Sequence, residues 1–237
     1  MPRNILLGEV WESFFIEGHK AGFLRRVTSV AENPNILVST LYIMYGSATF
    51  QHVFSFYDEA GYPPYSYLFD TNDGAPVHVR FAGREMICQV DEDIFTEAIP
   101  ADARPSYGNY PLVVTMPFAE GFKLSFTQIE DSSWSVQGAA ELISHGWENI
   151  IIGSQHLRLW RVGEYINGQP GNRYWLDENH RVRLSHWRGA VSHWVATSEE
   201  AFSNLPAELV EYARELFGAG NASDWTAAVE RWLDQND

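Results

Sequence analysis

Short runs of alternating apolar and polar residues, separated by turn residues, fill most of the chain between residues 5 and 196. Alternation with a period of two is typical of a half-buried β-strand, and strands at hairpin spacing pair antiparallel. Glu17-Gly18 and Asn167-Gly168 supply turn residues that tolerate positive φ. Few helical stretches interrupt the series, which argues against a parallel βαβ architecture. The sequence therefore predicts an all-β fold, a single antiparallel β-barrel of about ten strands around an internal cavity.

Two segments depart from this pattern. Residues 91–110 contain Pro100, Pro105 and Gly108, which predicts a long loop with one helical turn around residues 94–98. Residues 112–118 then resume as an expected strand. From residue 198 to 235 we expect C-terminal helices: residues 206–217 carry apolar side chains on one helical face, and a second helix follows Ser223. We expect one domain spanning residues 1–237.

Composition excludes several classes of protein. The 237 residues carry a formal charge of −15, which argues against nucleic-acid binding because phosphate backbones recruit clustered Lys and Arg. The sequence contains no run of about 18 apolar residues, so it predicts no membrane-spanning helix. The apolar stretch at the N-terminus is broken by Gly8, Glu9 and Glu12, so we expect no secretory signal and a cytoplasmic protein. The lone Cys88 excludes an internal disulfide and is expected to fill the core.

Aromatic residues make up 14% of the chain. This is more ring surface than a small core needs, which indicates an aromatic-lined cavity.

The familiar enzyme motifs are absent from the sequence. It contains no nucleophile elbow, no phosphate-binding glycine loop and no dinucleotide-binding fingerprint. His180, His186 and His193 are too widely spaced to form a metal-binding pair on one helix. We therefore expect no cofactor and no metal.

Three histidines fall on apolar strand faces, and alternate residues of a strand face the same side of a sheet. His186 shares its face with Val182 and Leu184, and His193 shares its face with Val191 and Val195. His52 lies among phenylalanines on residues 49–58. Each histidine is therefore predicted either to face the cavity as a catalytic group or to be a core side chain held by a backbone carbonyl.

Two carboxylates complete the candidate catalytic set. Glu9 shares a face with Trp11 and Phe15, and Asp70 ends an aromatic strand. A carboxylate beside ring surface is desolvated, which raises its pKa toward the range useful for acid–base chemistry. The alternatives are that Glu9 lies at a rim and that Asp70 begins a turn. Arg161, if buried, needs a carboxylate or carbonyl partner.

Parts of the sequence resemble known families. The strand that begins with Glu9 and Trp11, its hairpin through Gly18 and Gly22, and the Tyr-Trp hairpin of residues 174–182 resemble lipoprotein-carrier-like and lipocalin-like β proteins. In size, acidity, strand-rich order and helical tail, the whole chain resembles the spiroacetal cyclases of the oligomycin and ossamycin type.

The cyclase resemblance implies a cofactor-free enzyme of polyketide, and hence antibiotic, biosynthesis. It would close a spiroacetal ring in a dihydroxy-ketone by general acid/base catalysis in the barrel cavity, with a small-molecule polyketide as its partner and a homodimer as a possible assembly. The alternative is a lipocalin-like or lipoprotein-carrier-like protein that shelters an apolar ligand without chemistry. A histidine and a carboxylate paired deep in the barrel would favour the enzyme.

Overall fold

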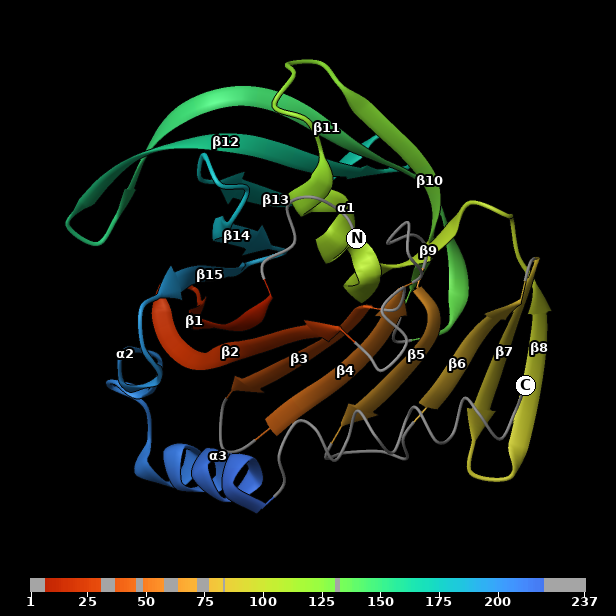
Figure 1. The fold of residues 1–237 in the computed structure, drawn as a ribbon, viewed down its shortest axis with the longest axis horizontal. Helices are drawn as coiled ribbons and strands as arrows, with labels where there is room; N and C mark the ends of the chain where they lie inside the picture. The colour runs from red at the N-terminus through yellow and green to blue at the C-terminus, as the bar shows by residue number, and fades with distance from the viewer. Residues whose placement is uncertain are drawn as a thin grey trace.

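The fold is a single curled sheet with short helices on both of its sides (Figure 1). The computed structural model describes residues 7–30, 37–45, 49–57, 64–71, 77–82, 84–130 and 133–219. The strands found there are β1 (Gly8–Ile16), β2 (His19–Val30), β3 (Leu37–Tyr45), β4 (Thr49–Tyr57), β5 (Pro64–Thr71), β6 (Val77–Ala82), β7 (Glu85–Val90), β8 (Asp93–Ala98), β9 (Ala103–Pro105), β10 (Lys123–Glu130), β11 (Ser135–Ile152), β12 (Gln155–Ile166), β13 (Gln169–Leu176), β14 (Val182–Trp187) and β15 (Ala190–Val195).

Neighbouring strands along the chain pair antiparallel in two series, β1 to β8 and β10 to β15. The two series meet where β1 pairs with β15, with Trp11 opposite Val195 and Phe14 opposite Ser192. The expectation of an all-β, barrel-like antiparallel fold is confirmed. One pairing is parallel, between β9 and β10.

The prediction of a closed barrel of about ten strands is wrong. The described strands form one fifteen-stranded sheet whose two edges are β8 and β9. These edges are joined by residues 99–102 but do not pair with each other. The strand β9 has only three residues, one of them Pro105, and proline has no N–H to donate to a ladder. The sheet therefore curls round without closing.

Side-chain packing brings the two ends of the sheet together. Met86 and Cys88 of β7 pack in one buried cluster with Ala103 of β9 and Ile129 of β10. Cys88 is buried as expected, and burial raises the pKa of its thiol to about 11, so the thiol stays protonated and fills the core.

Residues 91–118 fold differently from the prediction of a loop followed by a strand. They form β8, β9, a 3-10 turn η1 (Ser106–Asn109) and the helix α1 (Tyr110–Thr115). The apolar run from Leu112 to Val114 is buried in the concave side of the sheet (Figure 1). A fully apolar run does not distinguish a buried strand from a buried helix, and Pro111 fits the first turn of a helix because the missing N–H has no partner there.

The convex side of the sheet is also covered. The helices α2 (Ser198–Phe202) and α3 (Ala207–Ala219) lie outside β1 and β2 (Figure 1). Leu209 and Ala213 of α3 form a buried cluster with Phe23 of β2, and Thr197 caps α2 by accepting a hydrogen bond from the backbone N of Glu200 at 3.2 Å. The expected helix over residues 206–217 is confirmed. The expected helix after Ser223 lies outside the described residues.

We predict that Phe23→Ala lowers the free energy of unfolding by about 3–5 kcal/mol, because Phe23 is fully buried and its ring centroid lies 5.0 Å from that of Phe202. The matched control is Phe95→Ala on the edge strand β8, where the side chain is 58% exposed and a change within about 0.5 kcal/mol is expected. Urea denaturation measures both. Equal losses in the two variants would contradict the placement of α2 and α3 on the sheet.

Candidate functional site

The concave side of the sheet holds a cavity of about 270 Å³ next to α1. Its walls come from both series of strands, so the curl of the sheet creates it. Many of its lining groups are polar. The lining includes Glu12, Arg26, Asn109, Tyr110, Gln128, Glu130, Glu164, Gly171, Asn172, Tyr174, Ser185, Trp187 and Arg188.

Glu164, in the middle of β12, is the most deeply buried acid of the cavity, with 1% of its surface exposed. Its Oε1 accepts a hydrogen bond from Asn109 Nδ2 at 3.2 Å, and its Oε2 accepts one from the backbone N of Asn172 at 3.1 Å. Burial raises the pKa of Glu164, against the opposing effect of these hydrogen bonds and of Arg188. The carboxyl therefore keeps its proton to higher pH than an exposed glutamate does.

Glu12 is the second buried acid, with 6% of its surface exposed. Its Oε2 accepts a hydrogen bond from Ser192 Oγ at 2.5 Å, across the pairing of β1 with β15. Burial raises the pKa of Glu12, and the Ser192 hydroxyl and the Arg26 guanidinium oppose that rise. Both series of strands thus contribute one buried carboxyl to the same cavity.

Two tyrosines, Tyr110 and Tyr174, line the cavity and also pack against the core. Arg26 Cζ lies 3.9 Å from the centroid of the Tyr110 ring, a cation–π contact in a desolvated setting. Burial raises the pKa of both Tyr110 and Tyr174, and the charges of Arg26 and Glu12 act on both phenols. Their hydroxyls therefore stay neutral and can donate or accept hydrogen bonds.

A chain of side-chain amides forms the floor. Asn109 Nδ2 also lies 3.4 Å from Gln128 Oε1, and Gln128 Nε2 donates to Gln137 Oε1 at 2.9 Å. Asn109 is only 2% exposed, and its Oδ1 is a buried acceptor with no partner within the described part of the protein. A buried acceptor without a donor costs free energy, so a ligand N–H or O–H that donated to this oxygen would remove that cost.

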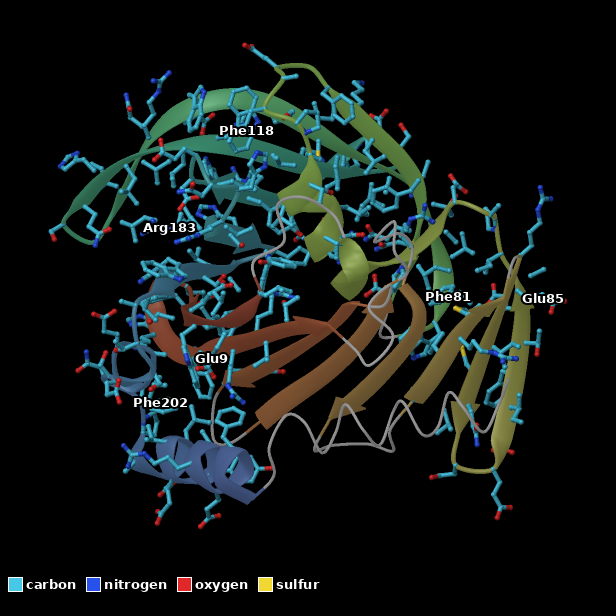
Figure 2. The ribbon with its side chains drawn as sticks, viewed as in Figure 1. Glu9, Phe81, Glu85, Phe118, Arg183 and Phe202 are labelled. Atoms are coloured by element: carbon cyan, nitrogen blue, oxygen red, sulfur yellow. The ribbon has the colours of Figure 1, made fainter. Side chains whose placement is uncertain are left out.

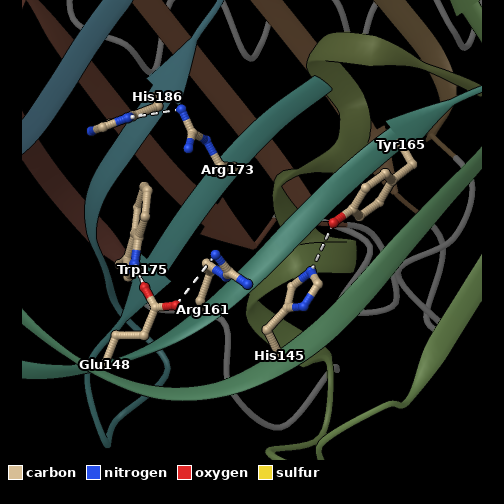
Figure 3. A network of polar contacts seen from close by, with 7 residues as sticks. All are labelled: His145, Glu148, Arg161, Tyr165, Arg173, Trp175 and His186. Atoms are coloured by element: carbon tan, nitrogen blue, oxygen red, sulfur yellow. Dashed lines mark hydrogen bonds and ion pairs between the residues drawn. The ribbon is translucent and has the colours of Figure 1, made fainter. Parts of the chain in front are cut away.

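The predicted inward placement of two histidines is wrong. On β14, Ser185 and Trp187 line the cavity, so alternation sends His186 to the convex face. There its ring lies 4.7 Å from Trp175, and Arg173 Nη2 lies 3.5 Å from its Nδ1 (Figure 3). Burial lowers the pKa of His186, and Arg173 adds to this effect.

His193 lies on the same convex face. Its neighbour Ser192 points to Glu12 in the cavity, while the His193 ring stacks on Phe15 with centroids 5.1 Å apart. Burial lowers its pKa, with a further contribution from Lys20. The alternation of residues along each strand did not show which face lines the cavity, because the convex face is apolar too, with Leu184 buried there. Both histidines were therefore assigned to the wrong face.

Glu9 also lies on the convex side (Figure 2). It is exposed and its Oε1 lies 2.5 Å from Arg25 Nε, whose guanidinium covers the Phe217 ring of α3 at 4.5 Å. The expected desolvation of this carboxylate is not found.

Arg161 pairs with Glu148 at 3.3 Å, and Glu148 also accepts a hydrogen bond from Trp175 Nε1 at 2.8 Å (Figure 3).

His52 and Asp70 stay predictions. The ladder between β4 and β5 places these two residues directly opposite each other, so they share one face of the sheet. Their side chains lie outside the described part of the structure.

Sequence reasoning missed Glu12 and Glu164, the two buried acids that line the cavity. The usable signal was a charged residue flanked on alternate positions by apolar ones, Glu12 beside Phe14 and Glu164 beside Val162. The pattern of β1 did not show which of its faces lines the cavity, because the face that carries Trp11 is equally apolar. In the structure that face packs under α2 and α3.

Within the described ranges, no three His, Cys, Asp or Glu side chains gather in a group that could hold a metal ion. Across the same residues, no helix has the length and apolar character needed to cross a membrane.

No protein-family model matches the chain, and no curated protein matches it. Among solved structures, a β-barrel-like protein of the domain of unknown function DUF1849 from Brucella abortus matches with a TM-score of 0.51 and 9% identity, over 78% of this chain and 93% of that one. This likeness supports the barrel-like fold and carries nothing about activity.

Two further structures are similar at lower TM-scores. A protein of the DUF1089 family from Pseudomonas aeruginosa has a TM-score of 0.38 and 13% identity, over 70% of this chain and 89% of that one. The hypothetical lipoprotein YmcC from Escherichia coli has a TM-score of 0.34 and 10% identity, over 80% and 87%. Likeness at this level supports no inference about this chain.

We predict that Glu164→Gln gains thermal stability relative to the unmutated protein as the pH rises from about 5 to about 8. The folded pKa of Glu164 is raised above the ordinary 4.5, so the stability that its protonated form contributes is present below that value and is lost as pH rises through the folded pKa. Glutamine does not titrate, so the difference in Tm, variant minus unmutated, grows with pH.

The matched control for this titration is Glu141→Gln on the exposed face of β11, where Glu141 pairs loosely with Lys123 at 3.7 Å. A difference in Tm that shrinks with pH for Glu164→Gln, or that follows the control, would show that Glu164 is not a buried acid.

Proposed function

We propose that this chain binds a compact polar small molecule in its concave-face cavity. The observation that carries the proposal is the depth of the polar groups: Glu164 and Asn109 lie at the bottom of the cavity, not at its rim. A sheltering carrier for an apolar ligand would instead have apolar walls with polar groups at the mouth. At about 270 Å³, the cavity is at the small end of ligand sites.

The arrangement supports binding because its polar groups are already fixed. Asn172 and Asn109 hold the Glu164 carboxyl from both sides, and Ser192 holds Glu12. Groups that are ordered before the ligand arrives lose little entropy when it binds. Trp187 and Tyr174 add aromatic surface to the walls, which suits a ligand with an apolar body and a polar head.

Acid–base catalysis is the second candidate, favoured by the raised pKa values of Glu12 and Glu164. A carboxylic acid that keeps its proton can protonate a carbonyl or hemiacetal oxygen, as spiroacetal closure in a polyketide requires. Only the reacting segment of a dihydroxy-ketone polyketide would enter a cavity of this size. Incubation of the pure protein with such an unspiroketalised substrate, followed by mass and ring-structure analysis, tests this candidate.

The binding proposal is tested with ligand-observed NMR on a panel of fragments of about 8 to 12 non-hydrogen atoms, cationic, neutral and anionic. Ser106 is a partly exposed lining residue, so Ser106→Trp fills the cavity without removing a core side chain. We expect fragments that bind the unmutated protein to lose at least about tenfold in affinity in this variant.

The matched control is Ser133→Trp, at an exposed serine in the turn before β11, which we expect to bind the same fragments unchanged. A panel with no hits, or hits that bind Ser106→Trp as well as the control, would overturn the proposal.

A further inference from the structure

The charges lining the cavity do not balance. Three carboxyls, from Glu12, Glu130 and Glu164, face two guanidiniums, from Arg26 and Arg188. Glu130 is half-buried and Arg188 is exposed, so water screens both of these charges. Two buried carboxyls, Glu12 and Glu164, then remain against the guanidinium of Arg26. A buried site with an excess of acids lowers its free energy either by keeping protons or by taking up a cation. The raised pKa values of Glu12 and Glu164 correspond to the first of these responses.

The two buried acids differ in what lies beside them. Arg26 acts on Glu12 electrostatically, and Ser192 donates to it. Glu164 receives its hydrogen bonds from neutral groups, the Asn109 amide and the Asn172 backbone N, and the guanidinium of Arg188 acts on it electrostatically. Within the described residues no cationic group donates a hydrogen bond to Glu164, so a cation in direct contact with this carboxyl would be a new partner.

Gly171 keeps the space beside Glu164 clear. A methyl group on Gly171 would lie 3.0 Å from Glu164 Oε2, and Gly171 itself lines the cavity. Glycine inside a strand often marks a place where a ligand or another backbone comes close. The absence of a side chain at Gly171 therefore avoids crowding Glu164 Oε2 on the side of the cavity.

A second acceptor lies close to the same carboxyl. Asn109 donates through Nδ2 to Glu164 Oε1, and its Oδ1 on the same amide is buried without a partner. Two acceptors on adjoining groups match a head group that carries several N–H donors. The wall already holds one such cation, since the Arg26 guanidinium lies over the Tyr110 ring.

We infer that the cavity binds a compact organic cation, a primary ammonium on a small apolar body, whose N–H groups donate to Glu164 Oε2 and Asn109 Oδ1. This inference rests on the proposed binding function and names its ligand class. On binding, Glu164 releases its proton to solvent, and the ammonium becomes the partner of the resulting carboxylate. Tyr174 and Trp187 supply the aromatic surface for the apolar body.

The test uses three probes that share a phenyl ring and differ in the charge of their polar group: benzylammonium is cationic, benzyl alcohol is neutral and benzoate is anionic. Affinities are measured at pH 7 by NMR, from shifts of the Asn109 side-chain amide and the Asn172 backbone amide. We expect benzylammonium to bind at least about tenfold more tightly than benzyl alcohol, as a charge-assisted hydrogen bond in a buried site allows. Benzoate is expected to bind most weakly.

The variant Glu164→Gln keeps the shape of the side chain and removes its charge, so it should abolish the preference for benzylammonium over benzyl alcohol. Glu141→Gln, on the opposite face of the sheet, should keep the preference. Benzyl alcohol or benzoate binding as tightly as benzylammonium would overturn the cation inference and leave the binding proposal standing. Failure of all three probes together with the whole fragment panel would overturn the binding proposal itself.

Discussion

The ladder between β1 and β15 holds the protein together. It pairs a strand from the start of the described chain with one about 180 residues later and thereby joins the two series of hairpins into one sheet. Contacts so distant in sequence are slow to form and cost loop entropy, so the ladder must be well stabilised. The Ser192–Glu12 hydrogen bond lies at this junction. The same junction therefore joins the two halves of the concave side and positions Glu12, one of its two buried acids.

Local sequence signals predicted the local structure well. The Glu17-Gly18 and Asn167-Gly168 turns have the positive φ angles expected of them, and the amphipathic helix of residues 206–217 is present. These features depend on residues close together in the chain, where turn chemistry and periodicity act directly. The likeness to barrel-like β proteins was correct at the level of the fold.

The candidate site could not be predicted in the same way, because it depends on which face of each strand is covered by what. Alternation shows two faces and does not say which one lines a cavity. Here both faces are apolar: the helices cover Phe23 on the outside, while α1 covers Leu142 on the inside. His186 was therefore placed inward and Glu164 was overlooked. The failure of the sheet to close depends on Pro105 and a three-residue strand, which no periodicity reveals.

The central claim is that Glu164 is a buried acid in the cavity, with its proton held by burial. The direct measurement is the pKa of its side-chain carboxyl, by carbon-13 NMR titration of the folded protein with Glu164→Gln used for assignment. The account predicts a pKa above the ordinary 4.5 of a glutamate. A pKa at or below that value would mean that water or a fixed cation reaches the carboxyl, and would contradict the cavity described above.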